Sequence, residues 1–142
     1  MEQEELWLTA DDFLRLFSVD CDRAGARDFL DIVQMWSIQL LFPELEVNRR
    51  SLVRMVLRKK GISPMVYWSR MKRDLLPVLS AESDTLECLG LPLPVERTCP
   101  DLMDALARAT AGHIEAEHRE KYRDVATYIQ RICMESERRK GK

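Results

Sequence analysis

The stretch VNRRSLVRMVLRKKGISPMVYWSRMKR, residues 47–73, holds nine basic residues and no acidic residue. The whole chain has a formal charge of −2, and since this stretch contributes +9, the remainder carries −11. Such a concentration of positive charge in an acidic chain indicates an anionic partner. The nine basic residues are Arg49, Arg50, Arg54, Arg58, Lys59, Lys60, Arg70, Lys72 and Arg73.

The same stretch has the capping and turn residues of two helices joined by a tight turn. Asn48 can cap a first helix, behind which apolar residues recur at helical spacing. Gly61 can end that helix in the left-handed conformation, after a basic last turn that suits the negative helix end. Ser63 and Pro64 then supply a new N-cap and a first-turn proline. We therefore predict a helix-turn-helix at about 49–76.

The pattern of the second helix fits this motif in part. A buried residue is expected four positions after the N-cap, and Tyr67 stands there. Another is expected three positions later, where the chain has Arg70 instead. Met71 and Leu75 continue the stripe that Tyr67 begins. Pro77 cannot donate a backbone hydrogen bond, so the helix should end or kink near residue 76.

Composition indicates a globular helical protein. The chain has 142 residues, of which 46% are hydrophobic and 32% charged, as is usual for one soluble domain. It has no apolar run near the roughly 18 residues of a membrane span, and its acidic start does not read as a signal peptide. The four cysteines form no CxxC motif, so we interpret them as reduced thiols of a cytoplasmic protein with no membrane partner.

We predict a single all-α domain, a compact bundle of about five to seven helices. It would comprise an acidic N-terminal segment (1–22), a helix-turn-helix core (23–111), and a long C-terminal helix with a basic tail (112–142). The other expected elements are helices at about 13–17, 23–41, 98–111 and 113–138, a polar break at 80–84 and an extended segment at 88–95. The expected N-caps are Thr9, Asp20 or Asp22, and Thr98 or Cys99.

DNA binding is the function that the basic block predicts. Duplex DNA is a dense line of phosphate charge, and clustered lysine and arginine displace its counterions. The helix from Pro64 would enter the major groove, where Met65, Val66 and Trp68 either make apolar contacts with base edges or belong to the core. The predicted DNA-binding residues are Arg49, Arg50, Arg54, Arg58, Lys59, Lys60, Ser63, Ser69, Arg70, Lys72 and Arg73.

Two alternatives involve the same basic residues. In one, the chain is a non-catalytic interaction module whose basic face binds an acidic partner protein. In the other, the basic face pairs with the chain's own N-terminal third, since residues 1–46 hold eleven acidic and three basic residues. Discrimination between duplex sequences separates DNA readout from acid binding, because an acid-binding face has no base readout.

The C-terminal helix carries a narrow apolar seam at coiled-coil spacing. It is formed by His118, Tyr122, Val125, Ile129 and Ile132. This seam could join two copies of the chain in a homodimer, which would match a two-fold DNA site. It could equally lie on the helix's own domain.

Enzymatic and metal-binding motifs are weak, and we predict no enzyme, cofactor or metal site. Residues 20–31 have the outline of a calcium loop, but Ala24 and Arg27 occupy places that do not fit, and helix capping explains the same acids. His113 and His118 lie five residues apart and would point to different faces of a helix. Cys99 at a helix start could have a lowered pKa, yet no neighbouring base is evident.

From about residue 28 to residue 109, the chain resembles the C-terminal DNA-binding domain of the sporulation master response regulator family. The matching pieces are Leu41–Glu44 (LFPE), Arg58–Ser63 (RKKGIS), Met71, Leu75, Leu89-Gly90 and Cys99–Leu106 (CPDLMDAL). The resemblance implies a helical domain built around a helix-turn-helix, with Lys72 and Arg73 among the basic residues of its recognition helix. The chain departs from that family at Met65, Val66, Trp68 and Ser69, where the family has polar or charged residues.

Overall fold

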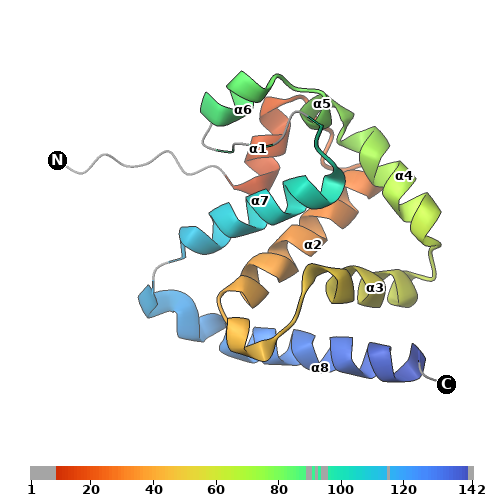
Figure 1. Cartoon of the computed structure of the whole chain (residues 1–142), viewed down its shortest axis with the longest axis vertical. Coiled ribbons are helices and arrows are strands. Elements are labelled where there is room, and N and C mark those ends of the chain that lie inside the picture. The colour runs from red at the N-terminus through yellow and green to blue at the C-terminus, as the bar shows by residue number, and fades with distance from the viewer. Residues whose placement is uncertain (1–8, 89–90, 92, 94–95, 115, 141–142) are drawn as a thin grey trace.

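The computed structural model describes residues 9–88, 91, 93, 96–114 and 116–140. These residues form an all-α bundle, as predicted, with helices in every layer (Figure 1). The elements are α1 (Ala10–Leu16), α2 (Ala24–Leu40), η1 (Pro43–Leu45), α3 (Arg49–Lys60), α4 (Pro64–Asp74), α5 (Leu76–Leu79), α6 (Ser83–Cys88), α7 (Cys99–Gly112), η2 (Ala116–Tyr122) and α8 (Arg123–Lys140), where η denotes a 3₁₀ helix. Within the described ranges, no helix is long and apolar enough to cross a membrane.

Helix α2 is the centre of the bundle. It runs diagonally through the molecule, and α1, α3, α4, α7 and α8 all pack against it (Figure 1). The sequence explains this position, because apolar residues cover more than half of the helix circumference. Phe29 and Ile32 have no exposed surface, and Val33 is 2% exposed.

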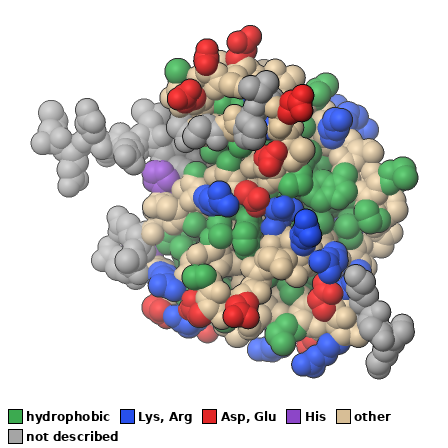
Figure 2. Space-filling view, viewed as in Figure 1, with side chains coloured by type: hydrophobic (Ala, Val, Ile, Leu, Met, Phe, Trp, Pro, Cys, Tyr) green, Lys and Arg blue, Asp and Glu red, His purple; other side chains and the backbone are tan. Residues whose placement is uncertain are grey.

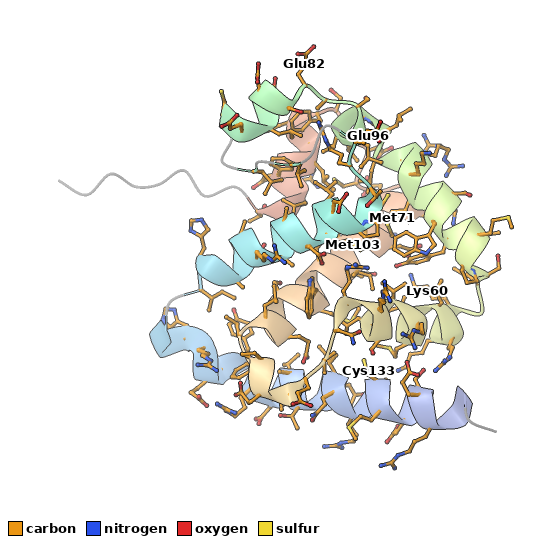
Figure 3. The ribbon with its side chains drawn as sticks, in the orientation of Figure 1. Lys60, Met71, Glu82, Glu96, Met103 and Cys133 are labelled. Carbon is orange, nitrogen blue, oxygen red and sulfur yellow. The ribbon has the colours of Figure 1, made fainter. Side chains whose placement is uncertain are left out.

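Helices α4 and α7 both pack on α2 and also contact each other. Met71 of α4 and Met103 of α7 are both fully buried and lie close together in the view of Figure 3. Methionine suits this position, because its flexible unbranched side chain fills irregular gaps between helices. The capping box of α7, in which Thr98 and Asp101 bond to each other's backbone N–H groups, fixes where that helix begins.

Helix α8 lies along α3 and on the end of α2. Ala126, Ile129 and Cys133 form its buried stripe, and Cys133 is labelled in Figure 3 where α8 faces α3. Two amides fasten the helix: Gln39 Nε2 donates to the carbonyl of Ala126 at 3.0 Å, and Gln130 Nε2 donates to a carbonyl of η1 at 3.0 Å. One stripe of α8 therefore packs on its own domain.

The expected caps are confirmed at four helix starts. Asn48 Oδ1 accepts from the Ser51 N–H at 2.9 Å, and Thr9 Oγ1 accepts from the Asp12 N–H at 3.4 Å. The other two are the Ser63 cap of α4 and the capping box of α7. The break at Pro77 is confirmed as well, since α4 ends at Asp74 and α5 begins at Leu76. Local side-chain chemistry was sufficient to place these boundaries.

The predicted cap of α2 is wrong. Its N-cap is Arg23, which makes no capping bond through its side chain. Asp20 Oδ1 accepts instead from the Asp22 N–H at 3.0 Å, within a local turn. An acid from α4 takes over the capping role, as described below.

Two further boundaries differ from expectation. The polar break after α5 is shorter than expected, because α6 begins at Ser83. Arg97 donates hydrogen bonds to Ser83 Oγ and to the carbonyls of Val78 and Ala81. The last α-helix begins at Arg123 and not at residue 113.

The 3₁₀ helix η2 precedes α8, and tertiary contacts hold it there. The guanidinium groups of Arg119 and Arg123 lie 4.9 and 4.8 Å from the ring centre of Phe42, and both pair with Glu44. His118 and Tyr122 of the predicted seam are therefore outside α8. Val125 of that seam is 44% exposed, whereas Ile129 is buried.

Part of the prediction falls outside the described residues. This applies to residues 1–8 of the acidic segment, to residues 141–142 of the basic tail, and to most of the extended segment at 88–95. The Leu89-Gly90 pair of the family resemblance is among them.

Candidate nucleic-acid interface

The turn between α3 and α4 seats both helices of the predicted motif on α2. Gly61 follows α3 with a φ of 65°, in the left-handed region that glycine adopts without strain. Ser63 Oγ then accepts from the Val66 N–H at 3.3 Å and starts α4. The buried apolar residues of α4 are Tyr67 and Met71, and Leu75 continues this stripe just after the helix ends. The opposite face of α4 is consequently turned to solvent.

A buried carboxylate lies beneath the junction of the two helices. Asp28 of α2 has a side chain that is 7% exposed, and it pairs with Lys60 at the end of α3. Arg70 of α4 approaches the same carboxylate at 3.8 Å. This explains Arg70 at a position where an apolar residue was expected: the side chain meets an acid of α2. One negative charge therefore faces two positive ones.

A second buried carboxylate repeats the arrangement at the other end of α4. The Asp74 side chain has no exposed surface, and its Oδ2 accepts from the Gly25 N–H at 2.8 Å. Its Oδ1 lies 3.1 Å from Arg73 Nε and 3.4 Å from Arg23 Nε. Here too, two arginines surround one carboxylate. The acid of α4 is thus hidden, and the outer surface of the helix keeps a positive surplus.

Arg49 belongs to a different side of the molecule. Its Nε donates to Asp104 Oδ1 of α7 at 2.9 Å, and Trp36 Nε1 donates to the same oxygen at 3.0 Å. The Arg49 side chain is only 21% exposed. It ties α3 to α7 and does not stand beside the outer face of α4.

Arg54 and Arg58 face α8. Arg54 Nη1 lies 3.1 Å from Glu137 Oε1, and Arg58 Nη1 donates to Ser136 Oγ at 2.6 Å. Both arginines thus bridge α3 to the C-terminal helix. The basic block of the sequence, continuous along the chain, is divided in space among three neighbours: α7, α8 and the α2–α4 junction.

The other five predicted DNA-binding residues are all exposed. Arg50, Lys59 and Lys72 make no ion pair with any part of the chain that the structure describes. Ser69 is exposed on α4, while Ser63 serves as its N-cap. The exposed basic residues at the two ends of α4 are Lys59, Lys60, Lys72 and Arg73.

The outer face of α4 is also apolar in its first turn. Met65 is 79% exposed and Val66 is 50% exposed, so neither belongs to the core. Trp68 is half-buried, with its ring edge-on to Tyr67 at a centroid distance of 5.5 Å. Figure 2 shows hydrophobic side chains gathered over the region of α4, with lysine and arginine side chains nearby. The exposed face of α4 therefore carries two large apolar side chains in its first turn.

Two buried thiols, Cys99 and Cys133, have raised pKa values. Burial raises the pKa of Cys99 to about 11, although the positive charge of Lys72 opposes this change. Burial raises the pKa of Cys133 to about 11 as well. A helix start therefore does not lower the pKa of Cys99, because desolvation of the thiolate outweighs it. Among the described residues, no group of three histidine, cysteine or acidic side chains is arranged to hold a metal ion.

Asp28 and Asp74 were not predicted as residues of this region. Both lie outside the basic block, and Asp28 was interpreted only as part of a weak calcium-loop pattern. Their role depends on how α2 and α4 cross, which the spacing of residues along one helix does not report. A signal was nevertheless present, because Arg70 interrupts an apolar stripe and such a base needs an acidic neighbour when it is half-buried.

Comparison with known proteins found no matching family, no matching curated protein and no matching solved structure.

Proposed function

We propose that this protein binds double-stranded DNA, with α4 in the major groove, and acts as a transcription regulator. The observation that supports this most directly is the outer face of α4. It is exposed and bears no acidic side chain, because Asp74, the only acid of that helix, is buried. A surface of this charge attracts the phosphates of a duplex, and the short turn at Gly61 that joins α3 to α4 supports a helix-turn-helix.

Four basic residues frame α4 and are the phosphate contacts of this proposal. Lys59 and Lys60 close α3, four to five residues before α4 begins, and Lys72 and Arg73 occupy the last turn of α4. Arg49, Arg54 and Arg58 are left out, because their partners lie on α7 and α8, away from α4. Lys60 and Arg73 also have acidic partners, Asp28 and Asp74, but they remain exposed beside the two ends of α4. The proposal therefore uses a narrower set than the eleven residues that the sequence predicted.

Salt dependence of binding tests this assignment. Fluorescence anisotropy of a labelled duplex at several salt concentrations should give a log–log slope of about −4, since each phosphate contact contributes roughly −0.9. The variant Lys72→Ala/Arg73→Ala should make the slope shallower, from about −4 to about −2, and weaken binding roughly tenfold or more. The matched control is Arg108→Ala/Arg131→Ala, which removes two exposed arginines from α7 and α8. Equal behaviour of the two variants would contradict the proposal.

A second candidate function is binding of an acidic partner protein on the same surface. The exposed Met65, Val66 and Leu76 favour it, because apolar and aromatic residues concentrate at the centre of protein interfaces. Salt weakens both kinds of complex, so salt dependence alone does not separate them. Sequence discrimination does, because only a DNA-binding surface distinguishes one duplex from another.

Selection from a random duplex library at physiological salt decides between the two. An enriched motif supports the DNA proposal, and a palindromic motif implies a homodimer. Val125 and Tyr128 of α8 are 44% and 57% exposed and are the first positions at which to look for its interface. A library that yields no enrichment and little retained DNA favours the protein partner.

A further inference from the structure

The first turn of α4 presents two apolar side chains to solvent at the place where a helix-turn-helix reads bases. Met65 and Val66 follow directly on the Pro64 that opens the helix, and they are 79% and 50% exposed. Neither side chain can form the bidentate hydrogen bonds by which Arg, Lys, Asn or Gln recognise guanine or adenine. Any base contact made by these two residues is therefore apolar.

The major groove offers one apolar group, the C5 methyl of thymine. Other base edges there present hydrogen-bond donors and acceptors, which would lose water against Met65 or Val66 without gaining a partner. A methionine side chain adapts its shape to such a small target, and valine holds a fixed one. The chemistry of the pair thus selects thymine and disfavours the other bases.

The basic side chains on and beside α4 are spaced to support this docking. Met65 and Lys72 lie seven residues apart, on one face and about 10 Å along the helix axis. The major groove is roughly 12 Å wide. With the first turn at the base edges, Lys72 and Arg73 fall at the phosphate wall, while Lys59 and Lys60 flank the other end through the short turn at Gly61.

We propose that Met65 and Val66 contact thymine methyl groups, so that the preferred target carries T·A pairs opposite the first turn of α4. This inference rests on the proposed DNA-binding function and extends it to sequence preference. Ser69, one turn further along the same face, is exposed and both donates and accepts hydrogen bonds, so it tolerates several bases beside the thymines.

Replacement of thymidine by deoxyuridine tests the inference, because it removes the methyl groups and preserves base pairing. The probe is the duplex recovered from the random library, compared with the same duplex containing deoxyuridine, by fluorescence anisotropy at one salt concentration. Burial of one methyl corresponds to roughly fourfold in affinity. We expect the unmodified chain to bind the deoxyuridine duplex about fourfold to sixteenfold more weakly, for one or two contacted methyls.

The variant Met65→Ala/Val66→Ala should bind both duplexes with equal, reduced affinity. Both residues are exposed, so its circular dichroism and thermal unfolding should match those of the unmodified chain. The control Leu16→Ala/Met134→Ala removes one exposed apolar side chain from α1 and one from α8 and should retain the full preference for thymidine.

The outcomes separate the inference from the function on which it rests. Equal affinity of the unmodified chain for both duplexes overturns the thymine contact and leaves DNA binding intact. A preference for thymidine that survives in Met65→Ala/Val66→Ala also overturns it, since other residues would then read the methyls. A library that yields no bound duplex refutes DNA binding itself, and the apolar pair is then assigned to a protein partner.

Discussion

The backbone N–H of Gly25 donates a hydrogen bond to Oδ2 of Asp74 at 2.8 Å, across 49 residues of chain. Gly25 lies in the first turn of α2, where four N–H groups have no partner within the helix. A carboxylate from α4 thus supplies the cap that no residue before α2 provides. The same carboxylate is buried between Arg23 and Arg73, so one side chain joins the start of α2 to the end of α4.

Asp74→Ala should therefore be strongly destabilising. It removes the cap of α2 and leaves a buried N–H without a partner, beside two arginines that lose their counter-charge. We expect a loss of about 2–4 kcal/mol in the free energy of unfolding, measured by urea denaturation. Arg73→Ala should cost less than about 1 kcal/mol, because that side chain is 57% exposed and Arg23 remains. Similar losses for the two variants would argue against a capping role.

Gly25→Ala tests how closely α2 and α4 approach. A Cβ atom at this position would lie 2.4 Å from the Arg70 carbonyl oxygen and 2.6 Å from Asp74 Oδ2. Since the first contact is with backbone, the two helices would have to move apart, at a cost of about 1–3 kcal/mol. Gly112→Ala is the control, because a Cβ there meets no atom within 4 Å. Thermal unfolding should show a lowered midpoint for the first variant only.

Gly61→Ala probes the conformation of the turn. A Cβ atom has free space there, so any loss of stability comes from the φ of 65°. We expect a cost of about 1 kcal/mol, because alanine in the left-handed region is strained. An unchanged urea midpoint would show that the turn relaxes to another conformation, and crystallography of the variant would identify it.

Alkaline pH should destabilise the protein through two buried thiols. The pKa values of Cys99 and Cys133 are raised from an ordinary 9.0 to about 11. Well below pH 9 both thiols are neutral in either state and stability is unaffected. Between pH 9 and pH 11 the unfolded chain loses these protons first, so the free energy of unfolding should fall by about 2 kcal/mol or more. Urea denaturation at each pH measures this fall, and Cys99→Ala/Cys133→Ala should reduce it.

Glu137→Ala tests whether α8 restrains the basic residues of α3. The substitution frees Arg54, which pairs with Glu137 at 3.1 Å, and removes one negative charge from the surface beside α3. If DNA binding is the function, affinity for any duplex should rise about twofold to fivefold at low salt, with a steeper salt slope. Anisotropy titrations measure both quantities. A variant with unchanged affinity would show that the side of α3 that carries Arg54 stands away from the phosphates.

Much of the fold could be predicted because it depends on local chemistry. Asn48, Gly61 and Ser63 have capping or turn roles that hold in almost any surroundings, and each was found where expected. The apolar surface of α2 likewise identified a central helix, since its residues must be buried somewhere.

The rest depended on contacts between distant segments. The cap of α2 comes from Asp74, and the start of α8 is displaced by arginines that stack on Phe42. For the candidate site, the sequence located the basic residues but not their neighbours. Arg49 and Arg54 were predicted to bind DNA together with the basic residues of α4, whereas Asp104 and Glu137 hold them toward α7 and α8. The exposure of Met65 and Val66 was open until the packing of α4 was known.

The central position of α2 sets the order in which parts of the molecule can open. Five helices pack on α2, so its amide protons meet solvent only when the whole bundle comes apart. Amides of α2 should therefore exchange with deuterium at the rate of global unfolding, whereas those near the exposed end of α8 should exchange through smaller openings. Because Asp74 and Asp28 connect α4 directly to α2, α4 should share the slow exchange of the centre. Helix α4, the proposed DNA recognition helix, would then be among the most rigid parts of the protein, pre-organised before any partner binds.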